Sequence, residues 1–356
     1  MAGFTAGDRI PDFSRPDQAG QARLFYDLYY GQPLALFVCG RADDAGTRTE
    51  LAALDADEPA LHEITRVVLV QGTPAQCAAL LPAPKPNLVV LADDGTLSMH
   101  LLGAAPGTIT AFVLDTNLRV TERRQRTLAD DPAKFLRKIV SLYEARPQRP
   151  AQLVRQAAPA LFVPGVLERA ACDGLIALFE ETGGQPSGTG YVQGNQVSWK
   201  ADPSVKMRRD IYLSEGPWLE RVKDALVRRV LPEVQRCFNF AVTQHEVFKV
   251  IRYDADTGGY FRPHRDNESR DTQHRRFAMT LNLNAGDYEG GRLKFPEFGP
   301  ELYEPERGAA VLFSCSLLHE VTPVTRGRRY ALLGFFFGDA QSMQPMQYQN
   351  LPQGGP

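Results

Sequence analysis

The stretch FKVIRYDADTGGYFRPHRD, residues 248–266, places a histidine and an aspartate two positions apart after a Gly-Gly turn. The residues after this turn are predicted to be extended, so side chains at positions i and i+2 point to the same face. His264 and Asp266 therefore converge, whereas Arg265 points away. An imidazole and a carboxylate on one face can bind the same metal ion.

A third ligand is predicted downstream, in GAAVLFSCSLLHEVTPV, residues 308–324. Its apolar and β-branched residues predict a strand that ends near Cys315, with His319 just beyond it. Two histidines and one carboxylate on one side of a metal leave positions open for other ligands, as in non-haem Fe(II) oxygenases. Zinc hydrolases use the same ligand types, so this set alone leaves zinc as an alternative.

An arginine in the next predicted strand favours iron. In TRGRRYALLGFFF, residues 325–337, Arg329 alternates with Ala331 and Leu333 on one face. A guanidinium that points into a small apolar interior requires a carboxylate, and 2-oxoglutarate has one at the end remote from the metal. A zinc hydrolase has no use for such a group. A one-residue slip of the strand register would place Arg328 inside instead.

From about Leu161 to Asp339 the chain resembles the prolyl-4-hydroxylase-type group of Fe(II)/2-oxoglutarate dioxygenases. The stretches that carry the resemblance are FKVIRYDADTGGYFRPHRDN, RFAMTLNLN, DYEGGRLKFPEFG, GAAVLFSC and LHEVTPVTRGRRYALLGFFF. The resemblance implies a double-stranded β-helix, or jelly roll, with flanking helices. It also implies Fe(II) as cofactor, 2-oxoglutarate and O2 as co-substrates, and ascorbate as a candidate reductant.

The resemblance further assigns roles to individual residues. It makes His264, Asp266 and His319 the metal ligands and catalytic residues. Arg329 becomes the anchor of the distal carboxylate of 2-oxoglutarate, because in the family the anchor directly precedes an aromatic residue. A last group is expected to line the co-substrate pocket: Tyr253, Thr280 and Asn282.

Two polar, glycine-bearing segments are expected to choose the substrate, residues 183–210 and residues 266–276. The first is long and has little periodicity, which is typical of a functional or disordered loop. By resemblance it matches a lid that closes over protein substrates, with cationic and aromatic side chains facing the site: Trp199, Lys200, Arg208 and Arg209. The alternative is a solvated linker.

The N-terminal half has a different pattern. Short apolar runs, LALFVC, RVVLVQ, NLVVLA and TAFVLD, alternate with helix-length segments at residues 47–64 and 129–145, which predicts an α/β fold. Most of residues 1–145 resembles the thioredoxin-like fold of peroxiredoxins.

This resemblance does not extend to chemistry. It places Thr47 where the peroxidatic cysteine should stand and Ile109 where an activating arginine is usual. A threonine cannot form a thiolate, and Cys39, inside a predicted strand, is interpreted as a small buried hydrophobe. The sequence therefore predicts a thioredoxin-like domain lacking the peroxidatic cysteine.

The domain boundaries follow from these patterns and from the proline-containing stretch ARPQRPAQ. We expect a thioredoxin-like domain at residues 1–146, a linker at 147–158, the dioxygenase domain at 159–340 and a C-terminal tail at 341–356.

Composition excludes several classes of partner. The 40 basic and 42 acidic residues are balanced in both halves, so nucleic acid is not expected. The five cysteines form no CxxC pair, which argues against a disulfide scaffold and fits the cytoplasm. No apolar run is long enough for a signal peptide or a membrane span.

The predicted activity is hydroxylation of a C–H bond, of a prolyl or other residue of a protein, with release of succinate and CO2. Two other classes stay open. One is a thiol peroxidase or reductase with an accessory C-terminal half, against which Thr47 argues. The other is a catalytically silent metal-binding interaction protein, against which the intact ligand set argues.

Overall fold

The computed structural model describes residues 3–56, 59–81, 85, 87–101, 107–127, 129–145, 150–193 and 196–339. The chain divides into two compact units, Met1–Ala151 and Gln152–Pro356, and each is considered by itself. Residues 147–149 of the expected linker and the whole expected tail, 341–356, lie outside the described residues.

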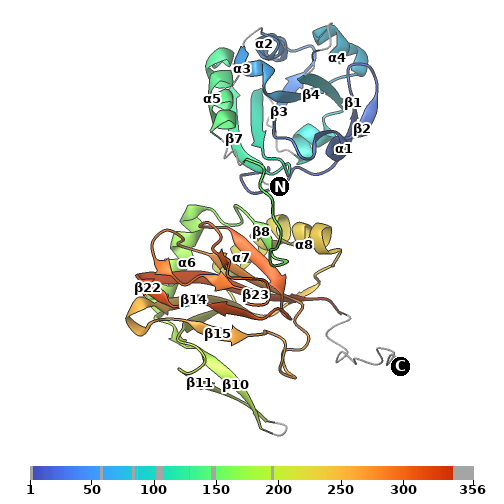
Figure 1. Ribbon diagram of the computed structural model, residues 1–356. Helices are drawn as coiled ribbons and strands as arrows, with labels where there is room; N and C mark the ends of the chain where they lie inside the picture. The colour runs from blue at the N-terminus through green and yellow to red at the C-terminus, as the bar shows by residue number, and fades with distance from the viewer. Residues whose placement is uncertain are drawn as a thin grey trace, which may run out of the picture. The chain divides into compact units, whose positions relative to one another are not determined.

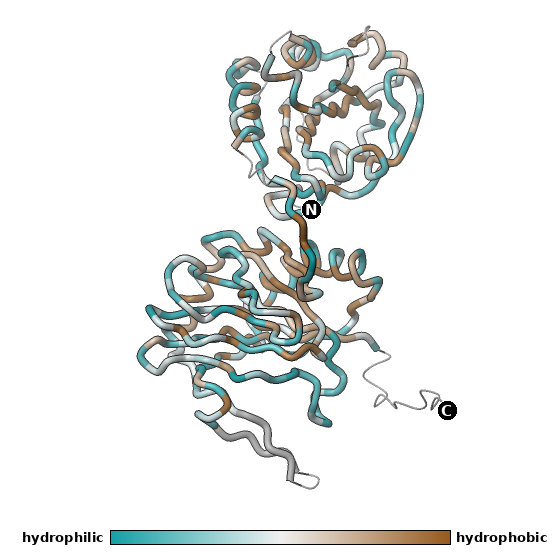
Figure 2. The backbone as a smooth tube through the Cα atoms, viewed as in Figure 1, coloured by the Kyte–Doolittle hydropathy of each residue, from teal (hydrophilic) through white to brown (hydrophobic). Residues whose placement is uncertain are grey.

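A five-stranded sheet forms the centre of the first unit (Figure 1). Counted across the sheet, the first three strands run parallel to one another, and each of the last two runs antiparallel to the strand before it. The order across the sheet is β5 (Leu88–Asp93), β4 (Thr65–Gln71), β3 (Leu34–Arg41), β6 (Thr108–Leu114) and β7 (Val120–Thr127). The strands are nearly continuous apolar runs because both faces are covered, and Figure 2 shows these hydrophobic segments at the centre of the unit.

Two apolar cores cover the faces of this sheet. One lies under α2 (Ala45–Leu54), α4 (Pro74–Leu80) and α5 (Pro132–Glu144). The other lies under α1 (Phe25–Tyr29) and the hairpin β1 (Ser14–Pro16) and β2 (Ala22–Leu24). This arrangement confirms the predicted thioredoxin-like α/β fold, with one difference. The helix expected over residues 47–64 is split into α2 and α3 (Pro59–His62), and a π-helical turn, Leu97–Leu101, precedes β6.

The second unit is built on an eight-stranded sheet. Its order is β8 (Leu161–Val163), β20 (Ala310–Ser314), β16 (Phe277–Asn282), β23 (Arg328–Phe337), β14 (Phe248–Asp254), β12 (Arg209–Leu213) and β9 (Gln185–Pro186), and β13 (Gln244–His245) also pairs with β23. All of these pairings are antiparallel. The long strand β23 is central, and its neighbours β14 and β16 align with it residue by residue.

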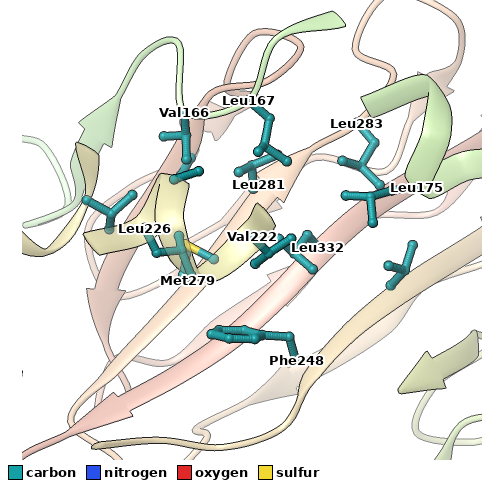
Figure 3. Packing of buried hydrophobic residues seen from close by; sticks show 14 of the residues in the cluster. Val166, Leu167, Leu175, Val222, Leu226, Phe248, Met279, Leu281, Leu283 and Leu332 are labelled. Atoms are coloured by element: carbon teal, nitrogen blue, oxygen red, sulfur yellow. The ribbon is translucent and has the colours of Figure 1, made fainter. Parts of the chain in front are cut away.

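Helices cover the outer face of this sheet. Alternate side chains of the strands, such as Met279, Leu281 and Leu332, pack against α6 (Arg169–Thr182), α7 (Pro217–Arg229) and α8 (Leu231–Phe238), as Figure 3 shows for α6 and α7. The helices of the chain are short or amphipathic. Within the described ranges, none has the length and hydrophobicity needed to cross a bilayer.

A smaller sheet faces the inner side of the large one. It contains β15 (Phe261–His264), β21 (His319–Val321), β18 (Leu293–Lys294) and β19 (Leu302–Tyr303), and β17 (Glu289–Gly290) pairs with β22 (Val324–Arg326) beside it. Apolar clusters fill the space between the sheets. The two facing antiparallel sheets confirm the predicted jelly roll with flanking helices.

The segment expected as a loop, residues 183–210, contains strands instead. β10 (Gly188–Gln193) and β11 (Gln196–Ala201) form an antiparallel hairpin that projects from the unit in Figure 1. β9 lies before this hairpin and β12 after it, at the edge of the large sheet. Cross-strand pairing, which a local pattern does not reveal, therefore orders much of the segment.

Truncation of a central core side chain should destabilise the second unit. Leu332 is fully buried on β23, so Leu332→Ala removes apolar contacts and leaves a cavity. We expect the free energy of unfolding to fall by about 2–5 kcal/mol. Both tryptophans, Trp199 and Trp218, belong to this unit, so urea unfolding followed by tryptophan fluorescence reports on it selectively.

Leu302→Ala is the matched control, because half of the Leu302 side chain is exposed. It should change the unfolding free energy by about 1 kcal/mol or less. Equal losses for the two variants would contradict the assignment of the core.

Candidate metal and co-substrate site

Two adjacent strands of the small sheet bring the predicted ligands together. His264 is the last residue of β15 and is the cross-strand partner of His319, the first residue of β21. Asp266 follows in the turn after β15. The Nε2 atoms of His264 and His319 lie 3.5 and 3.3 Å from the two carboxylate oxygens of Asp266. These ligand atoms lie within 4.8 Å of one another, as a shared metal ion requires.

Backbone hydrogen bonds orient both imidazole rings. Nδ1 of His264 lies 2.8 Å from the carbonyl oxygen of Arg262, and Nδ1 of His319 lies 2.9 Å from that of Leu317. A carbonyl oxygen only accepts, so each Nδ1 carries the proton. The lone pair of each Nε2 is left for a metal ion, which is the usual arrangement of metal-binding histidines.

The loop that carries Asp266 is held at its backbone. The N–H of Asp266 donates to the carbonyl of Cys315, at 3.0 Å, and the guanidinium of Arg275 donates to the carbonyl of Asp266, at 3.1 Å. Arg275 is in turn fixed by Glu246, whose carboxylate accepts at 2.6 and 2.8 Å. Both strands and the following loop therefore position the carboxylate.

The protonation states suit a cation. Burial lowers the pKa of His319, which keeps its imidazole neutral. Burial alone would raise the pKa of Asp266, but the positive charges of His319 and His264, when these rings are protonated, and of Arg275 lower it below the usual range. A neutral imidazole and an ionised carboxylate are the forms that bind metal.

Aromatic rings enclose the ligands. Phe261 stacks on the His264 ring with centroids 3.5 Å apart, and Phe313 meets His319 edge-on at 4.7 Å. Phe295 packs against Phe313. These rings restrict the imidazoles and keep water from one side of the cluster.

The register of β23 separates the two candidate arginines. Arg329 is 3 % exposed and lines the cavity beside the ligands, on the same face as Leu333. Arg328 points outward, where it pairs with Asp254 at 3.1 Å and with Glu180 at 3.5 Å. The geometry therefore places Arg329, not Arg328, in the interior.

The other predicted pocket residues are placed differently from one another. Tyr253 is buried, is the cross-strand partner of Arg329, and its ring lies 5.5 Å from the guanidinium carbon. Thr280 accepts a hydrogen bond from Arg329 at 3.4 Å. Asn282 is buried on the same face of β16, but it is not part of the cavity wall, and its amide donates to the carbonyl of Pro305.

At the end remote from the metal ligands, the interior fits a carboxylate. No carboxylate of the described residues lies within ion-pair distance of Arg329, and its buried Nε has no hydrogen-bond partner there. A buried cation with an unsatisfied donor is unfavourable unless a ligand completes it. Gly291 allows the backbone to approach the Arg329 side chain, because a Cβ there would lie 2.9 Å from its Cδ.

The cavity has a volume of about 320 Å³, at the lower end of the range for small-molecule sites. It is lined on one side by the ligands and Arg329. The lining also contains residues that the sequence analysis did not single out for the site: Lys206, Lys249, Asp210 and Arg275. The period-two pattern of β14 would have revealed Lys249, because it alternates with Ile251 and Tyr253.

Comparison with known proteins agrees with this geometry. The profile of the 2OG-Fe(II) oxygenase superfamily matches residues 248–337, which contain the three predicted ligands and Arg329. A PKHD-type hydroxylase of Phenylobacterium zucineum (strain HLK1) is 31% identical over 182 residues, 48% of this chain and 74% of that protein. The chain belongs to the 2OG-Fe(II) oxygenase superfamily.

Structural neighbours of this oxygenase were found for each unit. A Pseudomonas putida prolyl-4-hydroxylase matches 51% of the chain and 92% of its own, with 19% identity and a TM-score of 0.40. The peroxidoxin BcpB of Mycobacterium tuberculosis matches 41% and 99%, with 22% identity and a TM-score of 0.35. The chain spans 24% to 60% of the length of other curated relatives that it matches, among them a mouse procollagen-lysine,2-oxoglutarate 5-dioxygenase.

The first unit of this oxygenase has no exposed thiol at the position where a peroxidase needs one. Thr47 is buried in α2, and Cys39 is buried in β3, where burial raises the pKa of its thiol far above the usual range. Ile109 is buried in β6. A guanidinium does reach α2, but it comes from Arg126 on β7 and is paired with Glu50.

Removal of one histidine should abolish tight metal binding by this oxygenase. We expect the wild-type protein to bind one equivalent of Fe(II) without oxygen. His319→Ala should weaken that binding by more than about 100-fold, since even the partners of metal ligands typically contribute about 10- to 100-fold. Competition with a chromogenic Fe(II) chelator measures the affinity.

His245→Ala is the control, because His245 is exposed and lies outside the ligand cluster. It should bind iron like the wild type. If His319→Ala retains wild-type affinity, His319 is not a ligand.

Proposed function

We propose that the protein is an Fe(II)- and 2-oxoglutarate-dependent dioxygenase that hydroxylates a C–H bond of a residue in a protein, a prolyl residue being the first candidate. One observation carries this proposal. A buried arginine without a carboxylate partner among the described residues, Arg329, lines the same cavity as His264, Asp266 and His319.

In this function His264, Asp266 and His319 would hold Fe(II), and Arg329 would hold the distal carboxylate of 2-oxoglutarate. When bound, these groups supply oxidation of a C–H bond by O2, coupled to conversion of 2-oxoglutarate to succinate and CO2. The donor set supports iron, because two imidazoles and one carboxylate leave positions open for a chelating co-substrate.

The chain's own residues would orient the co-substrate and enclose the metal ligands. Tyr253 and Thr280 flank the Arg329 guanidinium and would fix the angle at which a carboxylate meets it. Phe261 and Phe313 pack on the two imidazoles and exclude water from the ligand cluster. Backbone carbonyls keep the Nδ1 protons of both histidines in place throughout a cycle.

Three finer assignments extend this proposal. A protein substrate is suggested by the sequence resemblance to prolyl hydroxylases and by the procollagen-lysine dioxygenase among the relatives. Ascorbate is proposed as a reductant for iron on the same resemblance. A cytoplasmic location is proposed because all five cysteines are free, which fits a reducing compartment.

The first unit is proposed to be a recognition or structural module. We assign it to residues 1–146, joined by a linker at 147–158 to the oxygenase domain at 159–340. Its buried Cys39 and Cys77 support this role, since neither thiol is accessible. A catalytically silent interaction protein is less consistent with the chain, because the cavity retains its ligands together with an unsatisfied arginine.

The decisive test is co-substrate turnover. Purified protein with Fe(II), O2 and 2-oxoglutarate should form succinate slowly even without a second substrate. Arg329→Ala should raise the half-saturating 2-oxoglutarate concentration by more than about tenfold, because loss of a desolvated charge pair costs on the order of 2–5 kcal/mol. Succinate is measured against 2-oxoglutarate concentration.

Arg328→Ala is the control for this test, since Arg328 is half exposed and pairs outside the cavity. It should change the 2-oxoglutarate requirement little. The reverse ranking of the two variants would show that Arg329 is not the anchor.

The first unit should show no peroxide reduction. A peroxidatic thiol must ionise near neutral pH, but burial raises the pKa of Cys77 to about 11 and that of Cys39 further. The full chain should consume hydrogen peroxide no faster than its Cys39→Ser, Cys77→Ser variant. Peroxide reduction by residues 1–146 that Cys39→Ser abolishes would revive the peroxidase alternative.

A further inference from the structure

Two lysines on the wall of the cavity form no ion pair with any of the described residues. Lys206 and Lys249 both line the cavity that contains the metal ligands. Within the described part of the chain, neither amine forms an ion pair or a side-chain hydrogen bond, although each lies over an aromatic ring. Partly buried lysines usually have a carboxylate or solvent contact that balances their charge.

The strands explain how these amines reach the cavity. Lys249 is on β14, on the same face as Ile251 and Tyr253. Lys206 ends a turn in which its own N–H donates to the carbonyl of Asp202. It also forms a β-bridge with Phe261. Its amine lies 5.0 Å from the Phe261 ring, which itself stacks on His264. Lys206 is therefore only one aromatic ring away from a metal ligand.

The other cations of this wall are already neutralised. Arg208 forms a two-pronged ion pair with Asp210, at 2.7 and 2.9 Å. Arg275 pairs with Glu246, and Arg265 pairs with Glu297. The remaining acidic groups of the lining are Asp266, a metal ligand, and two exposed residues of the loop after it, Glu268 and Asp271.

The charges of the co-substrate site balance without the lysines. Fe(II) with Asp266 has a net charge of +1, Arg329 adds another, and 2-oxoglutarate carries two negative charges. The two lysine charges are then left over on the wall beside the reaction centre. An additional anion would be attracted to this position.

We propose that Lys206 and Lys249 bind an acidic side chain of the polypeptide substrate, close in sequence to the residue that is hydroxylated. This inference rests on the proposed function, and it adds a substrate class: acidic sequence next to the target residue. The two amines act as specificity determinants and take no part in the oxidation.

The electrostatics of the wall agree with this role. Burial, followed by the nearby Arg208 and Lys249, lowers the pKa of Lys206 to about 7. Burial and Arg208 also lower the pKa of Lys249. Asp210 attracts both amines, but it does not offset burial, and its carboxylate is already paired with Arg208. A carboxylate between the amines would reverse both effects, since an opposite charge within a few ångströms favours the charged form.

The test uses the full-length protein with Fe(II) and 2-oxoglutarate under anaerobic conditions. Its probes are three fluorescein-labelled peptides with a central proline flanked by glutamates, glutamines or lysines. The glutamate peptide should bind at least about tenfold more tightly than the glutamine peptide, as expected for charge-assisted hydrogen bonds. The lysine peptide should bind most weakly. Fluorescence anisotropy measures each dissociation constant.

The variants connect this preference to the two amines. Lys206→Met combined with Lys249→Met should abolish the preference for glutamate over glutamine, whereas Lys206→Arg with Lys249→Arg should keep most of it. Lys223→Met, on the exposed side of α7, is the control and should bind like the wild type. Urea unfolding by tryptophan fluorescence shows that each variant is folded.

Three results would overturn the inference: no binding of the glutamate peptide to the wild type, equal binding of the glutamate and glutamine peptides, or a preference that survives the double methionine change. Weakened 2-oxoglutarate binding with unchanged peptide binding would also overturn it and assign the lysines to the co-substrate. The proposed function fails separately, through absence of succinate, because the anisotropy measurement needs no turnover.

Discussion

The antiparallel register of β23 between β14 and β16 is the constraint on which the second unit depends. Because side chains alternate along a strand, this register sends Leu332 into the helix-covered core and Arg329 into the cavity. Burial of the apolar side chains under the helices thus keeps the guanidinium of Arg329 in the cavity, although desolvation of that charge is unfavourable. The stability of the core and the chemistry of the cavity are consequences of one pairing.

Much of this could be predicted from the sequence, because a strand has a period of two. His264 and Arg329 were predicted to point inward from that period, and the structure places them there. Asp266 also lies at the cavity, but it does so from the turn after β15, because the strand ends at His264 and not at Asp266 as the period assumed. Asn282 has the same period but lies beyond the cavity, since alternation specifies a face and not a distance along it. Its roles and those of the other site residues remain predictions.

Other features depend on pairing between distant segments, which no local pattern contains. The segment expected as a lid forms the β10–β11 hairpin, and Lys206, which lines the cavity, is bridged to the distant Phe261. In the first unit the cation beside α2 is Arg126, whose partner Glu50 is 76 residues away in sequence. The resemblance to peroxiredoxins places Ile109 of β6 at the position of the activating arginine, and it gave no indication of Arg126.

Consecutive residues of β23 connect the inside of the second unit to its outer helix. The Tyr330 hydroxyl donates to Glu180 on α6 at 2.6 Å, and the same carboxylate pairs with Arg328 and Arg252. Arg329, which lies between Arg328 and Tyr330 in β23, faces the cavity. One short segment of β23 therefore contacts both the cavity and α6. Binding of a co-substrate would then slow the amide hydrogen exchange of α6, on the far side of the sheet.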